Sequence, residues 1–364
     1  MNSCLFLNTF YDGFLKQSYA ESDLDSQPYD IQLDALNATG FGDSDFYSSG
    51  LRSSGWETND IVFNCAPLQI AWAKEHCVQA ASLFDILEAQ VRYYSPDVLY
   101  IQDMHSFGQE HLERLRKWVK LIVGQIASPV GENIPLQMYD LVISCCPHFV
   151  TRFREQGVRA EYQPLAFAPR LLRDVSVPEK DIEISFVGGI SGMHSKGNHF
   201  LSTCASLMRL DIWGYGGDSI PQGHPLGRYH HGPVFGLDYF RILARSKMTL
   251  NRHIDIAENY ACNMRMYEAT GVGALLITDM KSNLGKLFEI GKEVVAYSSP
   301  EEAVDIIKYL TENPRIVEQI AAAGQARTLR DHTYSKRMRQ TASWLESLLA
   351  SKPIGPRRAA TAAL

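Results

Sequence analysis

Short apolar runs alternate with helical segments along roughly the first 160 residues of the chain. Continuous apolar runs of this length are typical of strands buried on both faces of a parallel sheet. Their alternation with helices predicts a doubly wound α/β fold, in which the strands end at one edge and ligands bind there. The predicted strands are Cys4–Asn8, Ile61–Cys65, Asp97–Gln102, Leu121–Ile126 and Leu141–Ser144, with a long helix at Leu68–Val91 and another at Phe149–Gln156.

The alternation restarts in the second half of the chain, after a connection at Gln163–Lys180 that lacks clear periodicity. A length of 364 residues exceeds one ordinary core and fits two domains. We therefore predict an N-terminal domain at residues 1–168, a second domain at 181–332, a closing helix at 333–350 and a flexible tail at 351–364. The second set of strands is predicted at Ile182–Val187, Leu210–Trp213, Met248–Leu250, Ala274–Ile277 and Glu293–Tyr297.

Composition and charge exclude several classes of protein. A net charge of −6 argues against a general surface for nucleic acid or anionic membranes. No segment approaches the ~18 apolar residues of a membrane span, and the N-terminus lacks the basic region of a signal peptide. The seven cysteines include no CxxC pair, and His230-His231 has no acidic or cysteine ligand at metal-binding spacing. We expect a cytoplasmic protein without a metal, a membrane span or a nucleic-acid partner.

Polar residues follow several predicted strands of the N-terminal domain. Asp103 and His105 come after one strand, Ser128 after the next, and His148 after another. Because parallel strands end at a common edge, these side chains are candidates for acid–base chemistry there. A single histidine after a strand is more often a structural residue, so both interpretations remain open.

A glycine-rich turn follows the first strand of the second domain. Glycine lets backbone amides approach a phosphate closely, and the N-terminus of the next helix adds a favourable dipole. Its spacing matches neither the GxGxxG pattern nor a Walker loop, so a plain tight turn is the alternative. The turn is Gly188-Gly189-Ile190-Ser191-Gly192, and Ser195 and Lys196 follow it as further hydrogen-bond donors.

The segment Asn259–Gly285 is predicted to be a helix that leads into a buried strand. Asn263, Arg265 and Glu268 are the polar residues at the start of the helix. Glu268 lies where the helix approaches the strand, and a carboxylate there needs a hydrogen-bonding partner. A core or capping role and a ligand-binding role both satisfy that need.

The chain as a whole, and its second half in more detail, resembles a known class of enzymes. Two αβα units with a closing C-terminal helix look like a GT-B glycosyltransferase, that is, two Rossmann-like doubly wound domains facing a cleft, with the C-terminal helix crossing back. The segments NMRMYEATGVGALLITD, NLGKLFEIGKEVVAYSSPEEAVDIIKYL and HTYSKRM resemble the C-terminal domain of CgeB-type spore-maturation proteins and related group 1 glycosyltransferases. The resemblance covers roughly Ile182–Leu349.

This resemblance implies transfer of a sugar from a nucleotide-diphosphate sugar of UDP, GDP or dTDP type to an unknown acceptor, which could be a glycan, a protein or a small molecule. No other cofactor and no metal is implied. Glu268 matches the glutamate that binds the donor ribose, and the Gly188-Gly189 turn would approach the pyrophosphate. Arg265, with Lys196 or Arg252, would neutralise the charge of the leaving nucleotide, and Asn263 is placed in the same donor site.

One departure from the family pattern concerns the reaction itself. Retaining group 1 enzymes carry two glutamates eight positions apart, whereas Tyr260 stands eight positions before Glu268 and Glu258 is out of register. The stereochemical course is therefore open, and an inverting reaction would need a base such as Asp103, His105 or His148. Two alternatives to a transferase are a nucleotide-sugar 2-epimerase and a non-catalytic structural spore or envelope protein with a vestigial cleft.

Overall fold

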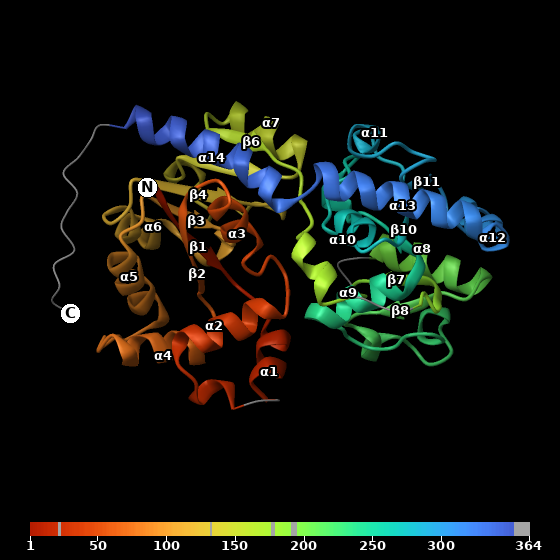
Figure 1. Ribbon diagram of the computed structural model, residues 1–364, viewed down its shortest axis with the longest axis horizontal. Coiled ribbons are helices and arrows are strands. Elements are labelled where there is room, and N and C mark those ends of the chain that lie inside the picture. Colours follow the sequence, from red (N-terminus) through yellow and green to blue (C-terminus); the bar gives the residue numbers. More distant parts are fainter. Residues whose placement is uncertain (21–22, 132, 176–178, 191–194, 353–364) are drawn as a thin grey trace. The chain divides into compact units, whose positions relative to one another are not determined.

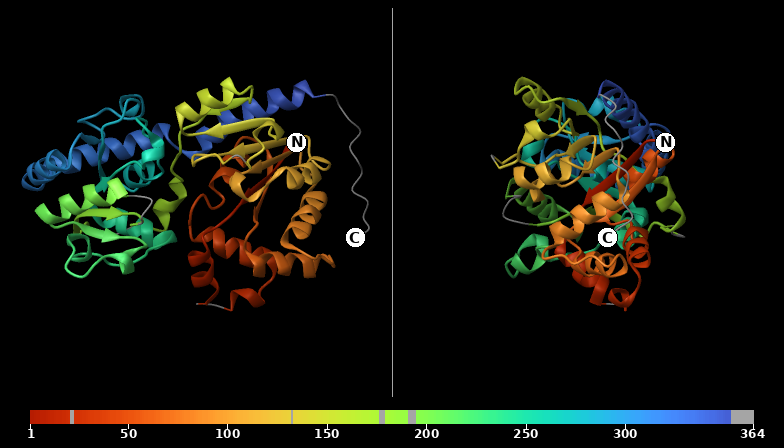
Figure 2. Two further views of the ribbon diagram at one scale, coloured as in Figure 1. Left: turned by 180° about the vertical axis from the view of Figure 1, so that it is seen from behind. Right: turned by 90° about the vertical axis from the view of Figure 1, so that its left-hand side faces the viewer.

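The polypeptide forms two compact units, each built on one parallel sheet with flanking helices (Figures 1 and 2). Unit 1 contains Met1–Pro164 and Tyr334–Leu364, and unit 2 contains Leu165–Thr333. The computed structural model describes residues 1–20, 23–131, 133–175, 179–190 and 195–352, except for the side chains of residues 195 and 196. Among the described helices, none has both the length and the apolar character that crossing a lipid bilayer requires.

The sheet of unit 1 has the strand order β2-β1-β3-β4-β5-β6, and all neighbouring strands run parallel. The order reverses beside β1, because β2 lies on one side of it and β3 to β6 follow on the other. Ligands bind most often at such a reversal, where two loops diverge from neighbouring strands. The strands are β1 (Ser3–Asn8), β2 (Glu57–Val62), β3 (Val98–Ile101), β4 (Leu121–Gln125), β5 (Leu141–Ser144) and β6 (Ala160–Tyr162).

The helices of unit 1 include the last helix of the chain, which returns to this unit as the resemblance implied. This helix, α14 (Tyr334–Ser351), packs against α3 (Phe46–Arg52). Gly50 permits the close approach, since a Cβ there would lie 2.9 Å from the Tyr334 carbonyl oxygen. The other helices are α1 (Asp12–Ala20), α2 (Tyr29–Ala38), α4 (Ala66–Glu75), α5 (Leu83–Tyr94), α6 (Gln109–Arg116) and α7 (Pro147–Glu155).

Two predicted elements of unit 1 were wrong in extent. The single helix expected at Leu68–Val91 is two helices, α4 and α5, and Ser82 begins the second by accepting a hydrogen bond from the Asp85 amide at 3.2 Å. The strand expected at Ile61–Cys65 is β2 at Glu57–Val62, which starts four residues earlier because this edge strand begins with polar residues. The short edge strand β6 was not predicted.

The sheet of unit 2 has the order β11-β10-β9-β7-β8 and is also parallel throughout. Here the order reverses beside β7, which lies between β8 and β9. Among its helices, α8 packs against α12, and α10 packs against both α9 and α13. The strands are β7 (Ile182–Val187), β8 (Asp211–Trp213), β9 (Ser246–Asn251), β10 (Leu275–Asp279) and β11 (Val295–Tyr297); the helices are α8 (Ser195–Leu207), α9 (Gly236–Arg245), α10 (Arg265–Gly271), α11 (Leu284–Leu287), α12 (Pro300–Glu312) and α13 (Pro314–Asp331).

The chain passes from unit 1 to unit 2 once and returns once, and the two crossing segments are paired within each unit. In unit 2 the Phe167 amide donates to the His332 carbonyl oxygen at 2.9 Å. In unit 1 the Gln163 side-chain amide donates to the Arg337 carbonyl oxygen at 3.0 Å and to Thr341 Oγ1 at 2.8 Å. Within each unit, hydrogen bonds therefore join the segment that leaves unit 1 to the segment that returns to it.

Candidate active site

The loops after β7 and β9 lie side by side at the reversal of strand order in unit 2. Gly188 and Gly189 follow β7, and Arg252 follows β9. In open α/β sheets a ligand binds outside the carboxyl ends of the strands at this kind of position. Most residues predicted to bind a donor therefore belong to loops or helices at this edge of unit 2.

The glycine turn after β7 is held against the loop after β8. The Gly188 amide donates to the Trp213 carbonyl oxygen at 2.8 Å, and the Ile190 amide donates to the Tyr215 carbonyl oxygen at 2.9 Å. A Cβ at Gly189 would lie 2.2 Å from Cζ of Tyr215, so a larger residue there requires the Tyr215 ring to move. The Gly188 amide is occupied by the neighbouring loop, which makes Gly189 the member of the pair that can offer its amide to a ligand.

Glycines on the β8 side make this contact possible. Gly214 and Gly216 have φ angles of +151° and +92°, which L side chains rarely adopt. A Cβ at Gly214 would lie 2.0 Å from the Gly188 carbonyl oxygen, and one at Gly216 would lie 1.7 Å from the Ile190 carbonyl oxygen. The backbones of the two loops therefore touch directly, and the shape of the glycine turn depends on both.

Arg265 begins α10 and places its guanidinium group beside the glycine turn. Its Nη2 atom lies 3.3 Å from the position that a Cβ of Gly188 would take, and its Cζ lies 5.7 Å from the centre of the Phe186 ring. The Nε atom is buried and has no hydrogen-bond partner among the described residues. A buried donor without an acceptor is costly in a protein, so this atom is suited to a ligand that supplies one.

Glu268 lies one helical turn after Arg265 and is only 8% exposed. Its Oε2 atom accepts a hydrogen bond from the Tyr239 hydroxyl group on α9 at 2.5 Å. Burial raises the pKa of Glu268, and the Tyr239 hydrogen bond and the Arg265 charge offset this only in part. In the described part of the chain, Tyr239 is the one hydrogen-bond partner of this carboxylate, so Oε1 keeps its capacity to accept.

Asn263 completes this group from the loop before α10. Its Nδ2 donates to Asn251 Oδ1 at 2.9 Å, and Asn251 in turn donates to Thr278 Oγ1 at 2.9 Å. The Oδ1 atom of Asn263 is buried and accepts no hydrogen bond from a described residue. Arg265, Glu268 and Asn263 therefore each present a polar atom that the described protein does not use, and we call these three residues the open polar cluster.

The remaining predicted donor residues behave differently. Arg252 forms an ion pair with Asp255, with 3.2 Å between Nη2 and Oδ1, so part of its charge is already neutralised. The side chain of Lys196 lies outside the described part of the structure. Tyr260, at the place of the missing first glutamate, is half-buried.

An interacting set at the ends of β9 and β10 was not predicted from the sequence. His253 is 2% exposed, and its Nδ1 lies 2.7 Å from Asp279 Oδ1, while Lys281 Nζ lies 3.2 Å from Asp279 Oδ2. Burial pushes the pKa of Asp279 upward, but the hydrogen bonds and charge of His253 and the charge of Lys281 outweigh it and hold the pKa below its usual value. These groups satisfy one another and fix the loop that carries Arg252.

A cavity of about 740 Å³ lies within the long loop that follows β8. Its lining includes Tyr215, His224, Arg228, His230 and Pro233. Tyr215 also packs on Gly189, so one side chain borders both the cavity and the glycine turn. The volume falls within the usual range for small-molecule sites.

The candidate residues of unit 1 are largely engaged with the protein itself. The Asp103 carboxylate accepts hydrogen bonds from Thr9 Oγ1 at 2.9 Å, Ser106 Oγ at 2.6 Å and the His105 amide at 3.1 Å. The His105 ring is exposed, and its Nε2 lies 2.7 Å from Ser128 Oγ. Asp103 and His105 thus share one turn after β3.

His148 stands apart from that turn along the sheet of unit 1. It lies in the first turn of α7, after β5, and β5 is two strands away from β3. Its ring centre is 4.6 Å from that of Phe149. The three predicted catalytic residues therefore form one pair and one separate histidine.

Comparison with known proteins adds a family and a fold. Residues 196–343 match a family model described as glycosyl transferase-like. No curated protein matches the chain. This family match spans most of unit 2 and reaches into α14, so it indicates a glycosyl transferase-like domain in the half of the chain that carries the open polar cluster.

Solved structures resemble the chain over nearly its whole length. Sucrose-phosphate synthase from Thermosynechococcus elongatus is 11% identical, with a TM-score of 0.59 over 97% of this chain and 100% of that chain. Anabaena HepE in complex with UDP-glucose is 14% identical, with a TM-score of 0.59 over 95% and 100%. AviGT4, a glycosyltransferase of avilamycin A biosynthesis, is 13% identical, with a TM-score of 0.59 over 97% and 99%. The family match indicates a glycosyl transferase-like domain at residues 196–343, and these likenesses show the fold: the chain has the GT-B architecture.

Proposed function

We propose that the protein transfers a sugar from a nucleotide-diphosphate sugar to an acceptor without the help of a metal ion. The observation that carries the proposal is the open polar cluster beside the glycine turn of unit 2. A cation, a carboxylate oxygen and an amide oxygen lie in the first turn of α10 and the loop before it, at the edge of the sheet where open α/β folds bind ligands. A nucleotide diphosphate presents complementary anionic oxygens and hydroxyl groups.

Each member of the site has a role that its geometry supports. Glu268 accepts the ribose hydroxyl groups through Oε1, since Oε2 is used by Tyr239. The Gly189 amide and the Arg265 guanidinium bind the diphosphate, and Asn263 Oδ1 accepts a further donor group of the ligand. Lys196 remains a second candidate cation, whereas the ion pair with Asp255 makes Arg252 a weaker one.

Arg265 also takes the chemical role that a divalent cation has in other glycosyltransferases. Negative charge grows on the nucleotide diphosphate as the glycosidic bond breaks. A cationic group aimed at that charge lowers the barrier, and in catalysis this kind of stabilisation is usually the largest single contribution. Because the Nε atom of Arg265 has no hydrogen-bond partner among the described residues, this atom can bind the ligand without giving up a hydrogen bond to any of them.

The first donor to test is a UDP-sugar. HepE, which shares the fold at 14% identity, has been solved in complex with UDP-glucose, and also with UDP and glucose. The acceptor stays undefined, and so does the narrower resemblance to CgeB-type proteins. For acceptor activation we propose His105 as the first candidate base, because its ring is exposed while the Asp103 carboxylate already accepts three hydrogen bonds.

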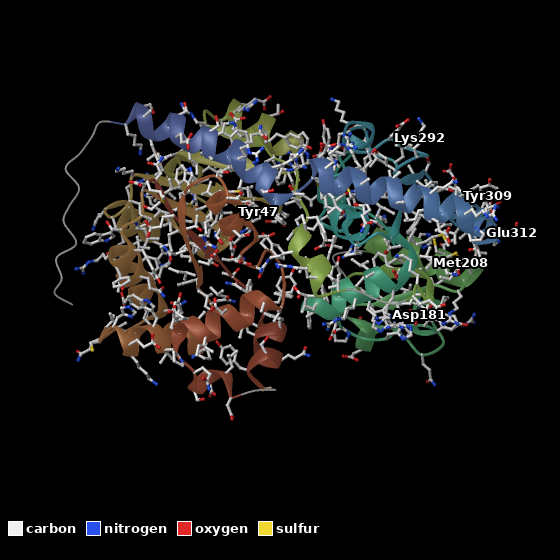
Figure 3. All side chains as sticks on the ribbon, viewed as in Figure 1. Tyr47, Asp181, Met208, Lys292, Tyr309 and Glu312 are labelled. Atoms are coloured by element: carbon white, nitrogen blue, oxygen red, sulfur yellow. The ribbon has the colours of Figure 1, made fainter. Side chains whose placement is uncertain are left out.

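Binding of UDP, GDP, dTDP and CDP, followed by donor hydrolysis and transfer with the matching sugars, tests the proposal. A nucleotide at a hundred times its Kd raises the free energy of unfolding by about 2.7 kcal/mol, which a thermal shift detects. Glu268→Gln should remove most of this shift. The matched control is Glu312→Gln at the exposed end of α12, which should behave like the wild type (Figure 3). Absence of binding and turnover with every nucleotide sugar would overturn the proposal.

A further inference from the structure

Tyr239 is a polar residue of unit 2 that the donor-binding roles above leave without a function. It lies in the first turn of α9, and its hydroxyl group reaches Glu268 on α10, a helix that packs against α9. The distance between the hydroxyl oxygen and Glu268 Oε2 is 2.5 Å, within the range of a hydrogen bond from a hydroxyl group to a charged carboxylate. The ring keeps partial exposure, but its hydroxyl group points to a carboxylate that is 8% exposed.

We propose that Tyr239 is a positioning residue for Glu268, holding one carboxylate oxygen so that the other faces the ribose of the donor. This inference rests on the proposed function. It adds that Tyr239, which does not itself touch the ribose, sets the orientation of the Glu268 carboxylate that does. A glutamate side chain has three rotatable bonds, and a buried one without a fixed partner could turn its carboxylate toward Arg265 instead. The Tyr239 hydroxyl group selects the orientation in which Oε1 remains able to accept.

The charges around Glu268 agree with this role. Among the described residues, two titratable groups act on the carboxylate, namely Tyr239 from α9 and Arg265 from the same helix as Glu268. Burial of the hydroxyl group, followed by the negative charge of Glu268, raises the pKa of Tyr239 well above its usual value. The phenol therefore keeps its proton and remains a donor throughout the range in which proteins are handled.

Removal of the hydroxyl group has a predictable sign. Burial raises the pKa of Glu268, and the hydrogen bond from Tyr239 lowers it, so loss of that bond leaves a still higher pKa. A protonated Glu268 has lost its charge and one acceptor site. Binding of a nucleotide should then fail at a higher pH in Tyr239→Phe than in the wild type, as the pH is lowered.

The experiment measures the affinity for UDP by calorimetry between pH 5 and pH 9 in the wild type, Tyr239→Phe and Glu268→Gln. Near neutral pH we expect Tyr239→Phe to bind UDP about tenfold more weakly, because one charge-assisted hydrogen bond is lost. The fall in affinity for UDP at low pH, which we call the acid limb, should begin at a higher pH in this variant than in the wild type. Glu268→Gln should bind weakly at every pH, without this limb. A fixed structural defect would lower the affinity without moving the limb.

The control is Tyr47→Phe, which removes the hydroxyl group of a buried tyrosine that belongs to unit 1 and is labelled in Figure 3. Tyr47 accepts a hydrogen bond from Gln125 Nε2 at 2.9 Å and is not among the residues proposed to bind the donor. Its affinity for UDP and its acid limb should equal those of the wild type. A shift in this control as large as that of Tyr239→Phe would overturn the inference.

Two further measurements separate this inference from the proposed function. The ¹³C resonance of the Glu268 carboxyl group, assigned by its loss in Glu268→Gln, reports the pKa without any ligand, and an unchanged pKa in Tyr239→Phe overturns the inference alone. If Tyr239→Phe does not fold, site-specific 3-fluorotyrosine at position 239, a stronger donor, should move the acid limb to lower pH, and no movement overturns the inference. A wild type that binds no nucleotide overturns both.

Discussion

The two units place polar residues at corresponding points of their sheets but use them in opposite ways. Each sheet reverses its strand order beside its first strand, β1 in unit 1 and β7 in unit 2. At the reversal in unit 1, the Asp103 carboxylate accepts three hydrogen bonds from the protein. At the reversal in unit 2, the open polar cluster keeps polar atoms without partners among the described residues.

This difference teaches that topology supplies a location and that side chains decide its use. A doubly wound sheet creates a crevice at the reversal whatever its sequence, and the same fold hosts many functions. In unit 1 the polar groups at that position hydrogen-bond to one another. In unit 2 the Nε atom of Arg265 and the Oδ1 atom of Asn263 have no partner among the described residues, and a ligand can supply the missing hydrogen bonds. The proposed donor site therefore lies in unit 2, where these unsatisfied polar atoms are and where the family model matches.

The largest expected effect comes from the backbone contact between the loops that follow β7 and β8. Gly216→Ala would place a Cβ 1.7 Å from the Ile190 carbonyl oxygen, so the two loops must separate. We expect a loss of about 4 kcal/mol or more in the free energy of unfolding, measured in urea. Gly223→Ala is the matched control, since Gly223 also has a positive φ of +80° but nothing within 4 Å, and it should lose about 1 kcal/mol. Equal losses would show that the loop contact does not matter.

The next effect concerns catalysis. Arg265→Met removes the cation beside the glycine turn and should lower kcat/KM by about 100-fold to 1000-fold, as the loss of an aimed charge does elsewhere. Arg241→Met is the control on the same unit, because Arg241 forms an exposed ion pair with Asp238 and should change kcat/KM by less than about threefold. If both variants kept the wild-type kcat/KM, Arg265 of unit 2 would not stabilise the negative charge on the leaving nucleotide.

A smaller effect tests unit 1. Asp103→Asn turns one carboxylate oxygen into a donor that faces hydroxyl and amide donors, so we expect unit 1 to lose about 2 kcal/mol in the free energy of unfolding. The affinity for UDP should stay unchanged. Asp30→Asn, at an exposed position of α2, should alter neither quantity. A fall in donor affinity without a loss of stability would reverse the comparison between the two units.

The smallest effect concerns the satisfied groups of unit 2. The pKa of Asp279 is held below its usual value of about 3.8, because the hydrogen bonds and charge of His253 outweigh the effect of burial. The stabilisation is therefore complete above the unfolded pKa and is lost as the pH falls through the lower folded pKa. Between pH 6 and pH 2.5, wild-type stability should fall more steeply than that of Asp279→Asn. The free energy of unfolding is measured in urea at each pH. Parallel pH dependences in the wild type and Asp279→Asn would contradict a stabilising interaction between His253 and Asp279.

Much of the fold was predictable because buried parallel strands are continuous apolar runs. The structure has β5 at Leu141–Ser144 and β7 at Ile182–Val187, as the sequence predicted. Polar edge strands carry a weaker signal, and β2 and β6 were misplaced or missed for that reason. The division between α4 and α5 left a usable signal, since Ser82 followed three residues later by Asp85 marks a helix start.

The candidate site was predictable as a list of residues but not as a set of contacts. Glu268 was singled out as a carboxylate in need of a partner, yet the partner, Tyr239, lies 29 positions earlier on another helix. The same limit hid the contact between His253 and Asp279. That the Gly188 amide is bound to Trp213 depends on the packing of two loops, and nothing in the glycine pattern alone distinguishes it from Gly189.

The double crossing between the units has a consequence for biosynthesis. Unit 1 is discontinuous in the sequence, because all of unit 2 is inserted before α14. On the ribosome, where domains form from the N-terminus onward, unit 2 is fully translated before the last helix of unit 1 emerges. A nascent chain that has reached Thr333 therefore contains every residue of unit 2. At that stage the surface of α3 around Gly50 is not yet covered by α14, which has still to be synthesised.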